Sequence, residues 1–351
     1  MCSSEELEYP QKLFDYAYGF LVSKTMFTAC ELGVFDFLHE AQEPVSAATI
    51  ASRLSTSVGG MERLLDACVG LKLLKVDLKN SEGYYSNTDV STVYLVKSSP
   101  RSLFHMMSYY SQTTYMCWHF LPQAVREGKC QYERPFGVSS KELFEAIFRS
   151  EEEMVTFMHN MDTMWNVCGK DIVQAFDLSA FHTVFDLGGC SGALAKQFVS
   201  RYNESTVTIM DLPKVVETAK KRFITDKDQQ IHFLEGDFFN DPIPEADLFI
   251  MARIINTWTE EKCLTLLRKI YQSCRPGGGV LLVEVLLNED RSGPVTSQLH
   301  SLNMLVQTEG RERTPSEYTK LLTDSGFRDV EVKATGKIHD VILGRKLINL
   351  D

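Results

Sequence analysis

The sequence predicts an α/β protein: a parallel sheet with helices on both faces, preceded by a smaller and mostly helical region. Three observations support this fold class. Strand-like apolar runs alternate with helical segments after residue 180, the stretch before them is helical, and the first hundred residues combine helices with a hairpin. A chain of 351 residues also exceeds the length at which one core usually stops growing. The predicted regions are 1–110, 111–175 and 176–351.

The first region is predicted to hold short amphipathic helices and a small hairpin. Apolar residues recur with a helical period between residues 13 and 21, and Ser46 is a candidate N-cap for a later helix. Two alternating segments, 75–79 and 84–88, flank an Asn-Ser-Glu-Gly turn. Helices followed by a hairpin make a winged helix, and such folds often bind DNA.

The charge of this region argues against nucleic-acid binding. Residues 1–100 carry 8 Lys and Arg against 13 Asp and Glu, a net charge of −5, and the whole chain carries −11. Binding to phosphates needs the opposite sign. We therefore expect the first region to be an association module, and we expect the protein to bind no nucleic acid.

Composition indicates a globular protein of a reducing compartment. The chain is 44% hydrophobic and has no uncharged apolar run of about 18 residues, so no transmembrane helix is expected. Its N-terminus is acidic and polar, unlike a secretory signal. Nine cysteines, with no CxxC pair, favour free thiols over a disulfide framework or a zinc site. These features predict a cytoplasmic protein without a bound metal and without a membrane partner.

The middle of the chain, from about 101 to 175, is helical in pattern and rich in aromatic residues and methionine. Such a stripe usually indicates core packing, and the alternative is that part of it lines an apolar pocket for a flat substrate. After residue 180 strand-like runs alternate with helical ones, and the chain ends with two more such runs within 329–346. The runs that predict the parallel sheet are 183–189, 206–213, 246–254 and 278–287.

The strongest local signal for a ligand is the segment 184–198, where a strand meets glycines and then becomes a helix. Glycines in such a turn let backbone N–H groups approach a ligand. The pattern is not the dinucleotide pattern GxGxxG. Instead the acid Asp186 ends the strand, which suits a ligand with a positive amino group and a sulfonium. The alternative is a tight strand-to-helix turn without a ligand.

Two further acids follow in order, one strand apart. Asp211 ends the next strand, where a carboxylate can accept hydrogen bonds from both hydroxyls of a ribose. Asp237 and Phe238 follow the third strand, where an adenine needs an acceptor at its edge and an apolar face. An Asp at a strand end often only caps a helix, but three in succession predict a nucleoside site.

With these residues in view, the chain resembles the S-adenosylmethionine-dependent small-molecule O-methyltransferases that carry an N-terminal dimerisation domain. The resemblance covers nearly the whole chain, and the last of its motifs is highly specific. The motifs are AYGFLVSK (17–24), ACELGVFD (29–36), AVREG (124–128), DLGG (186–189), EGDFF (235–239), RPGGG (275–279) and SLNMLVQTEGRERTP (301–315).

The resemblance implies a class I, Rossmann-like methyltransferase sheet and a winged-helix-like N-terminal domain that joins two copies in an intertwined homodimer. It implies S-adenosyl-L-methionine as cofactor, no metal, and a small indole or phenol as methyl acceptor. Within the family it implies conversion of N-acetylserotonin to melatonin. Matching motifs assign the cofactor positions to Phe148, Trp165, Asp211, Gly236, Asp237, Phe238 and Arg253. The loop residues Asp186 and Gly188 complete the predicted cofactor set. They assign substrate positions to Tyr109, Phe157, Met161, Asn303, Met304 and Gln307.

Helical spacing agrees with part of that assignment. Asn303 and Gln307 lie four residues apart, so they share a helical face and could hold the amide of an acylated side chain, with Met304 packed nearby. The alternative is that both amides cap or crosslink helices. Glu284 and Glu309 are further candidates, because carboxylates near the acceptor orient the base in this family, although a Glu at a helix or strand end is usually only exposed.

The general base is where the sequence departs from the family. The family has His-Asp-Trp after the fourth strand, and this chain has Asn256, Thr257 and Trp258. Asparagine accepts no proton near neutral pH, and a positioned base is worth about 10²–10⁴-fold in rate. His300 shares a helical face with Asn303 and is a candidate substitute base, and His159 is a weaker one.

The cofactor loop departs as well. The family has Asp-x-Gly-x-Gly-x-Gly, and here Cys190 replaces the middle glycine. If that position needs a positive φ, a side chain there costs on the order of 1–3 kcal/mol and weakens cofactor binding. The alternative is an ordinary φ with the thiol turned away. Two hypotheses follow: an active methyltransferase, or a catalytically weak homologue that acts by binding or by dimerising, perhaps with an active subunit as its partner.

Overall fold

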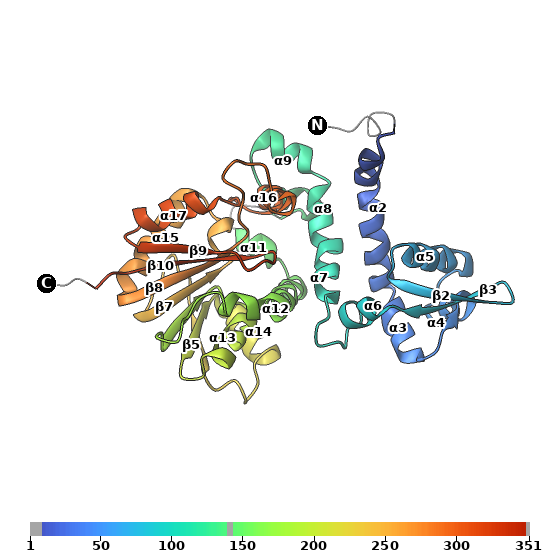
Figure 1. Ribbon diagram of the computed structural model, residues 1–351, viewed down its shortest axis with the longest axis horizontal. Helices are drawn as coiled ribbons and strands as arrows, with labels where there is room; N and C mark the ends of the chain where they lie inside the picture. The colour runs from blue at the N-terminus through green and yellow to red at the C-terminus, as the bar shows by residue number, and fades with distance from the viewer. Residues whose placement is uncertain (1–8, 139–142, 349–351) are drawn as a thin grey trace. The chain divides into compact units, whose positions relative to one another are not determined.

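The computed structural model describes residues 9–138 and 143–348 and divides into two compact units, one ending at Gln112 and the other beginning at Thr113 (Figure 1). The second unit takes in nearly all of the helical segment that the sequence analysis places at 111–175. Together the units contain helices, a small sheet and a large mostly parallel sheet, which confirms the predicted α/β class.

The first unit is helical with one small sheet. The Oγ of Ser46 accepts the backbone N–H of Thr49 at 3.4 Å, which confirms the predicted N-cap. The predicted hairpin is present, with Asn80 and Ser81 at positive φ in its turn. The sheet has the order β1-β3-β2. The elements are α2 (Gln11–Glu31), α3 (Val34–Ala41), β1 (Val45–Ser46), α4 (Ala47–Arg53), α5 (Val58–Gly70), β2 (Leu74–Lys79), β3 (Glu82–Asn87), α6 (Asp89–Tyr94) and α7 (Phe104–Tyr109).

Helix α2 differs from the prediction of short amphipathic helices. It runs for 21 residues, and its apolar side chains are spread around the helix so that no single face could bury them. Leu13 is 65% exposed and Tyr16 is 75% exposed, whereas burial begins only near the end of the helix, at Phe27. The prediction was wrong for this helix because spacing within residues 13–21 ignores the apolar residues on its other sides.

The second unit is built on a seven-stranded sheet with the order β6-β5-β4-β7-β8-β10-β9. Strands β4 to β8 are parallel, and β10 runs antiparallel between β8 and β9, so the predicted strands and the terminal pair are confirmed. The strands are β4 (Thr183–Leu187), β5 (Thr206–Asp211), β6 (Ile231–Glu235), β7 (Ala246–Ala252), β8 (Cys274–Glu284), β9 (Arg328–Lys333) and β10 (Asp340–Arg345).

The helices of this unit include a π-helical turn at its start and a 3-10 turn after β7. They are η1 (Tyr110–Thr114), α8 (Tyr115–Trp118), α9 (Leu121–Glu127), α10 (Glu133–Phe136), α11 (Leu143–Ile147), α12 (Glu151–Val173), α13 (Ala193–Arg201), α14 (Pro213–Arg222), η2 (Ile255–Thr257), α15 (Glu260–Ser273), α16 (Val295–Gln307) and α17 (Pro315–Asp324).

Alternating side chains along the strands divide between two cores. Phe249 and Leu282 face the core formed with α15 and α17, whereas Leu248 and Leu281 face the core formed with α12 and α13. Helices therefore cover both faces of the sheet, as Figure 1 shows. Central strands with apolar residues on both sides are typical of a buried parallel sheet.

This topology places the candidate site. Parallel strands end at the same edge of the sheet, and ligands bind beyond that edge. Asp186 and Asp211 lie at the ends of β4 and β5, Asp237 and Arg253 follow β6 and β7, and Glu284 ends β8. Five polar residues from five strands therefore share one edge.

Residues 9–138 and 143–348 can be described with respect to membrane helices, metal sites and disulfides. No helix in these ranges is both long enough and apolar enough to cross a membrane. No group of three or more His, Cys, Asp or Glu side chains in them is arranged to hold a metal ion. All eight cysteines found there are free thiols.

Candidate active site

The loop after β4 has the backbone of a ligand-binding turn. Gly188, Cys190 and Gly192 have φ values of 72°, 55° and 84°, which are left-handed values. The positive φ excludes the alternative of an ordinary φ at Cys190, and a residue with a Cβ is strained there. Its side chain is buried at 7% exposure and packs in an apolar cluster with Met158 of α12.

Asp186 is a buried carboxylate that the described residues leave without a partner. It is 1% exposed, and neither of its oxygens accepts a hydrogen bond from any described residue. Burial, with a smaller contribution from Asp211, raises the pKa of Asp186 to about 7. A buried acid without a cation is costly, so the site is electrostatically suited to a positively charged ligand.

Asp211 joins the loop to the next strand. One of its oxygens accepts the backbone N–H of Cys190 at 3.0 Å, and the other accepts that of Leu212 at 2.8 Å. Burial raises the pKa of Asp211 to about 6, although both hydrogen bonds favour the ionised form. Each oxygen keeps a lone pair for a further donor, such as a ribose hydroxyl.

The third predicted segment lies beside the same loop. A Cβ placed on Gly188 would come within 3.6 Å of the Phe238 ring, so the ring lies close to the glycine loop. Gly236 donates its N–H to the carbonyl of Asp211 at 3.0 Å. The carboxylate of Asp237 accepts the N–H of Phe239 and the side-chain amide of Asn240, so it also shapes its own turn.

Helix α12 presents the aromatic and methionine stripe to this loop. Phe148, Phe157 and Met161 pack around the buried cluster that contains Cys190. The rings of Phe148 and Phe157 meet edge to face with centroids 5.7 Å apart. The structure therefore brings together two predicted substrate positions and one predicted cofactor position.

Trp165, a second predicted cofactor position, lies on α12; it is buried against a histidine that the sequence analysis did not single out. The ring centroids of Trp165 and His339 are 5.2 Å apart. His339 is 2% exposed, and neither ring nitrogen has a hydrogen-bond partner among the described residues. Burial, then Arg253 and His300, lower the pKa of His339 well below its usual value, so the ring is neutral.

Arg253 anchors a buried charged cluster. Its Nη2 lies 2.6 Å from the Glu312 carboxylate, and its Nη1 lies 3.1 Å from that of Glu284. Both glutamates are fully buried. Burial opposes the charge of Arg253, but Glu312 and then Glu284 outweigh it and raise the pKa of the guanidinium. Burial also disfavours the charged form of Glu284 and so raises its pKa, and the charge of Arg253 offsets part of that rise.

The turn η2 carries the residues at the family's base position. Glu284 accepts the backbone N–H groups of Ile255 and Asn256 at 3.0 and 3.3 Å, which holds the turn at the end of β8. The side-chain amide of Asn256 donates to the Met304 sulfur at 3.0 Å and to Glu312 at 3.3 Å. Asn256 is therefore a fixed, buried donor, and it offers no basic nitrogen.

Helix α16 brings the predicted substrate residues to the same place. Asn303 and Gln307 are hydrogen-bonded to each other at 2.5 Å, and Met304 contacts Asn256. His300 lies one turn earlier and is half-buried. Burial, followed by the charge of Arg253, lowers the pKa of His300, and the charge of Glu312 partly opposes this.

Four other candidates lie apart from this group or act through their neighbours. Glu309 forms an ion pair with Lys262 at 2.8 Å on the surface and does not join the buried carboxylates. The His159 ring packs on Phe223 with centroids 4.8 Å apart. The Thr257 hydroxyl donates to the carbonyl of Arg253 at 3.3 Å. Tyr109 is a buried residue of the first unit.

Comparison with known proteins gives the family. The model of the O-methyltransferase domain matches residues 118–328, and that of the O-methyltransferase dimerisation domain matches residues 14–97. The chain belongs to the O-methyltransferase family.

Similar O-methyltransferases align with nearly the whole chain. The acetylserotonin O-methyltransferase of Gallus gallus is 59% identical over 346 residues, which are 99% of this chain and 100% of that protein. The Homo sapiens enzyme of the same name is 52% identical over the same shares. The crystal structure of human N-acetylserotonin methyltransferase in complex with SAM has a TM-score of 0.95, covering 99% of this chain and 100% of that chain. None of these proteins is described as a binding protein without activity, so that hypothesis gains no support from them.

Several residues of this O-methyltransferase site escaped the sequence analysis. Glu312 lies inside the motif 301–315, but nothing in its spacing distinguishes it from Glu309, and only the fold buries it. Gly310 packs so closely that a Cβ on it would lie 2.1 Å from the carbonyl oxygen of Asn256. The signal for Gly310 was its place in a specific motif, whereas His339 carries no signal in the sequence.

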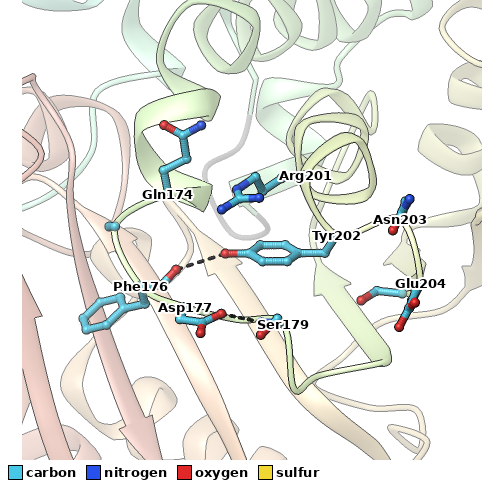
Figure 2. A pocket seen from close by; sticks show the side chains of 10 residues that line it. Gln174, Phe176, Asp177, Ser179, Arg201, Tyr202, Asn203 and Glu204 are labelled. Atoms are coloured by element: carbon cyan, nitrogen blue, oxygen red, sulfur yellow. Dashed lines mark hydrogen bonds between the residues drawn. The ribbon is translucent and has the colours of Figure 1, made fainter.

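A separate hollow lies near the other edge of the sheet of this O-methyltransferase. It has a volume of about 570 Å³ and lies where α12 and α13 end, before β4 and β5 begin (Figure 2). The Tyr202 hydroxyl accepts the N–H of Leu178 at 3.2 Å and donates to the carbonyl of Phe176 at 3.0 Å. Figure 2 shows Tyr202 reaching across to this loop, and no predicted site residue lines the hollow.

Proposed function

We propose that this protein transfers the methyl group of S-adenosylmethionine to the ring hydroxyl of N-acetylserotonin, forming melatonin. The observation that carries the proposal is the near full-length similarity to two acetylserotonin O-methyltransferases, at 59% and 52% identity. Fold similarity alone would not reach the substrate, because one fold serves many reactions.

The residues at the sheet edge fit the methyl donor. S-adenosylmethionine carries a positive amino group and sulfonium, and the buried oxygens of Asp186 have no partner among the described residues. Asp211 would accept the ribose hydroxyls, and Phe238 would cover the adenine from beside the glycine loop. Phe148, Trp165, Gly236, Asp237 and Arg253 complete the proposed cofactor set.

The proposed acceptor site adjoins the cofactor residues at the same edge of the sheet. Phe157 and Met161 offer an apolar wall for a flat indole, and Asn303, Met304 and Gln307 hold the acyl side chain. Tyr109 stays a predicted substrate position on the strength of the family motif alone. Such a wall with a few directed polar groups is typical of a small-molecule site.

Bound S-adenosylmethionine supplies an electrophilic methyl group on a sulfonium. In the reaction the carbon–sulfur bond breaks, the oxygen–carbon bond forms, and the hydroxyl proton needs an acceptor. Asn256 cannot accept it, and the Glu284 carboxylate is held in place by two backbone N–H groups and Arg253. We assign the proton to His300, whose lowered pKa keeps the imidazole neutral and able to accept it.

The position of His300 supports this assignment. It lies one helical turn before Met304, whose sulfur contacts Asn256, and the charges of Arg253 and Glu312 act on its pKa in opposite directions. Glu312 accepts a hydrogen bond from the side-chain amide of Asn256 and pairs with Arg253, so both charged groups belong to the buried cluster at the family's base position. Glu284 and Thr257 position the turn η2, and we assign no catalytic contact to Glu309.

The proposal includes a homodimer through the N-terminal domain, which we assign to the winged-helix class, and a cytoplasmic location. The dimerisation-domain match and the exposed apolar side chains of α2 support the dimer. Free thiols throughout the described cysteines support a reducing compartment.

The direct test is methyl transfer by the purified protein from labelled S-adenosylmethionine to N-acetylserotonin. We expect labelled melatonin, and calorimetry should show cofactor binding. Tight cofactor binding without transfer would overturn the proposal. His300→Ala should lower kcat by about a hundredfold without changing cofactor affinity. An unchanged kcat would remove His300 as the proton acceptor, and His159→Ala is the matched control on α12.

A further inference from the structure

A chain of hydrogen bonds links α8, α16 and Tyr132 in the second unit. The indole nitrogen of Trp118, on α8, lies 2.7 Å from Oδ1 of Asn303. Nε2 of Gln307 lies 2.5 Å from the same oxygen, and the hydroxyl of Tyr132 lies 3.2 Å from Oε1 of Gln307. The bond between Trp118 and Asn303 joins residues 185 positions apart in the chain.

Chemistry sets the direction of every bond in this network. An indole N–H can only donate, so Asn303 must turn its carbonyl oxygen to Trp118. The amide of Gln307 then faces an acceptor and must present its NH₂ group. Its own oxygen is left for Tyr132, whose hydroxyl donates. The donor-only indole therefore orients both amides.

This network leaves the NH₂ group of Asn303 as a hydrogen-bond donor. With Oδ1 of Asn303 taken by two donors, its NH₂ group is the polar group left for a ligand, and it has no hydrogen-bond partner among the described residues. Asn303 is half-buried, whereas Tyr132 is fully buried and Gln307 is 6% exposed. Gln307 bonds through both ends of its amide, because Nε2 also lies 3.5 Å from the Thr114 hydroxyl.

We propose that Trp118 and Tyr132 are positioning residues that make Asn303 a dedicated donor to a carbonyl oxygen of the methyl acceptor. This inference rests on the proposed function and assigns the residues that set its preference for an N-acylated side chain. An acyl carbonyl accepts the Asn303 NH₂ group, whereas the ammonium of a free amine is itself only a donor. A site built around one hydrogen bond rejects ligands that leave it unpaired.

The inference orders three acceptors. N-acetylserotonin offers a carbonyl oxygen, 5-hydroxytryptophol a hydroxyl that can accept, and serotonin a donor-only ammonium. We expect kcat/KM to fall in that order for the unchanged protein. If N-acetylserotonin is methylated but serotonin equally well, this inference fails while the proposed function stands. If N-acetylserotonin is not methylated by protein that binds the cofactor, the proposed function fails instead.

Variants test the two positioning residues. Trp118→Phe removes the donor that orients Asn303, so the preference for N-acetylserotonin over serotonin should fall about tenfold, chiefly through KM. Tyr132→Phe removes one hydroxyl, changes the volume little, and should lower the same ratio by a smaller factor. Tyr271→Phe, on α15 and packed against Phe327, is the matched control and should leave the ratio unchanged.

Cofactor affinity from calorimetry reports whether each variant is folded. An unchanged ratio in both Trp118→Phe and Tyr132→Phe, with cofactor affinity intact, would overturn the inference. Because a purely structural role would lower kcat for every acceptor alike, the ratio between acceptors distinguishes positioning from general destabilisation.

Discussion

Replacing Asp186 by asparagine should change how the stability of the cofactor-free protein depends on pH. The carboxyl is 1% exposed, and no described residue bonds to its oxygens. Its ionised form is therefore penalised in the folded state and not in the unfolded chain. Asparagine has nearly the same volume and no charge, so the substitution isolates the titration.

The magnitude follows from the two pKa values of Asp186. The ordinary pKa is 3.8 and the folded pKa is about 7. A group whose pKa is raised on folding stabilises the protein below its unfolded pKa, and that stability is lost as the pH rises through the folded pKa. The difference between these two pKa values corresponds to about 4 kcal/mol of stability, of which about 3 kcal/mol is lost between about pH 5 and pH 8.

The assay is urea denaturation of both proteins without cofactor, at several pH values across that interval. The free energy of unfolding of the unchanged protein should fall by about 3 kcal/mol relative to that of Asp186→Asn between about pH 5 and pH 8. Taking the difference cancels Asp211, whose raised pKa acts in the same direction in both proteins. The exposed Asp226→Asn is the matched control and should run parallel to the unchanged protein.

Cofactor binding gives the second half of the test. A proton on Asp186 competes with a cationic ligand, so the affinity for S-adenosylmethionine should rise with pH until the carboxyl is ionised. Asp186→Asn should bind weakly and lose that dependence. Parallel stability curves for the unchanged protein and the variant would refute the reasoning, because they would mean that Asp186 titrates in the folded protein as it does in water.

Three further predictions concern the two departures from the family and a glycine packed against one of them. Cys190→Gly removes the strained side chain at φ 55°, so the Kd for S-adenosylmethionine in calorimetry should fall about fivefold; an equal or higher Kd would contradict the strain argument. Asn256→His with Thr257→Asp should raise kcat at neutral pH by about a hundredfold in the methyl-transfer assay, and no gain would mean that the pocket no longer fits the family's base. Gly310→Ala forces a Cβ against the carbonyl of Asn256, so kcat should fall at least about tenfold, whereas Gly59→Ala, with open space around it, should be neutral in the same assay.

Much of the fold and one side of the site could be predicted from the sequence because their signals are local. A buried parallel strand is an apolar run, and the residue at its end is read directly from the chain, as with Asp186 and Asp211. The spacing of Asn303 and Gln307 likewise placed them on one face of a helix. The hairpin and the cap at Ser46 are also encoded within a few residues.

The rest depends on contacts between distant segments, which no local pattern encodes. Glu312 and Glu309 look alike in the sequence, but one is buried against Arg253 and the other is on the surface. The bond between Trp118 and Asn303 joins two helices that nothing in their spacing relates. The prediction for helix α2 was wrong because the spacing within residues 13–21 does not show that apolar side chains surround the whole helix.

Cys190 and Asn256 should leave different kinetic signatures, which makes their effects separable. The backbone N–H of Cys190 donates to Asp211, the carboxylate proposed to bind the ribose. Strain at Cys190 should therefore weaken cofactor affinity, and its effect on rate should vanish at saturating cofactor. Proton removal follows the binding of both substrates. The lack of a base at position 256 should therefore lower kcat at any cofactor concentration and alter the pH profile of kcat. A protein limited only by the loop would therefore reach family-like rates at high cofactor concentration. A protein limited at Asn256 would not, because its amide is held as a donor to Met304 and Glu312.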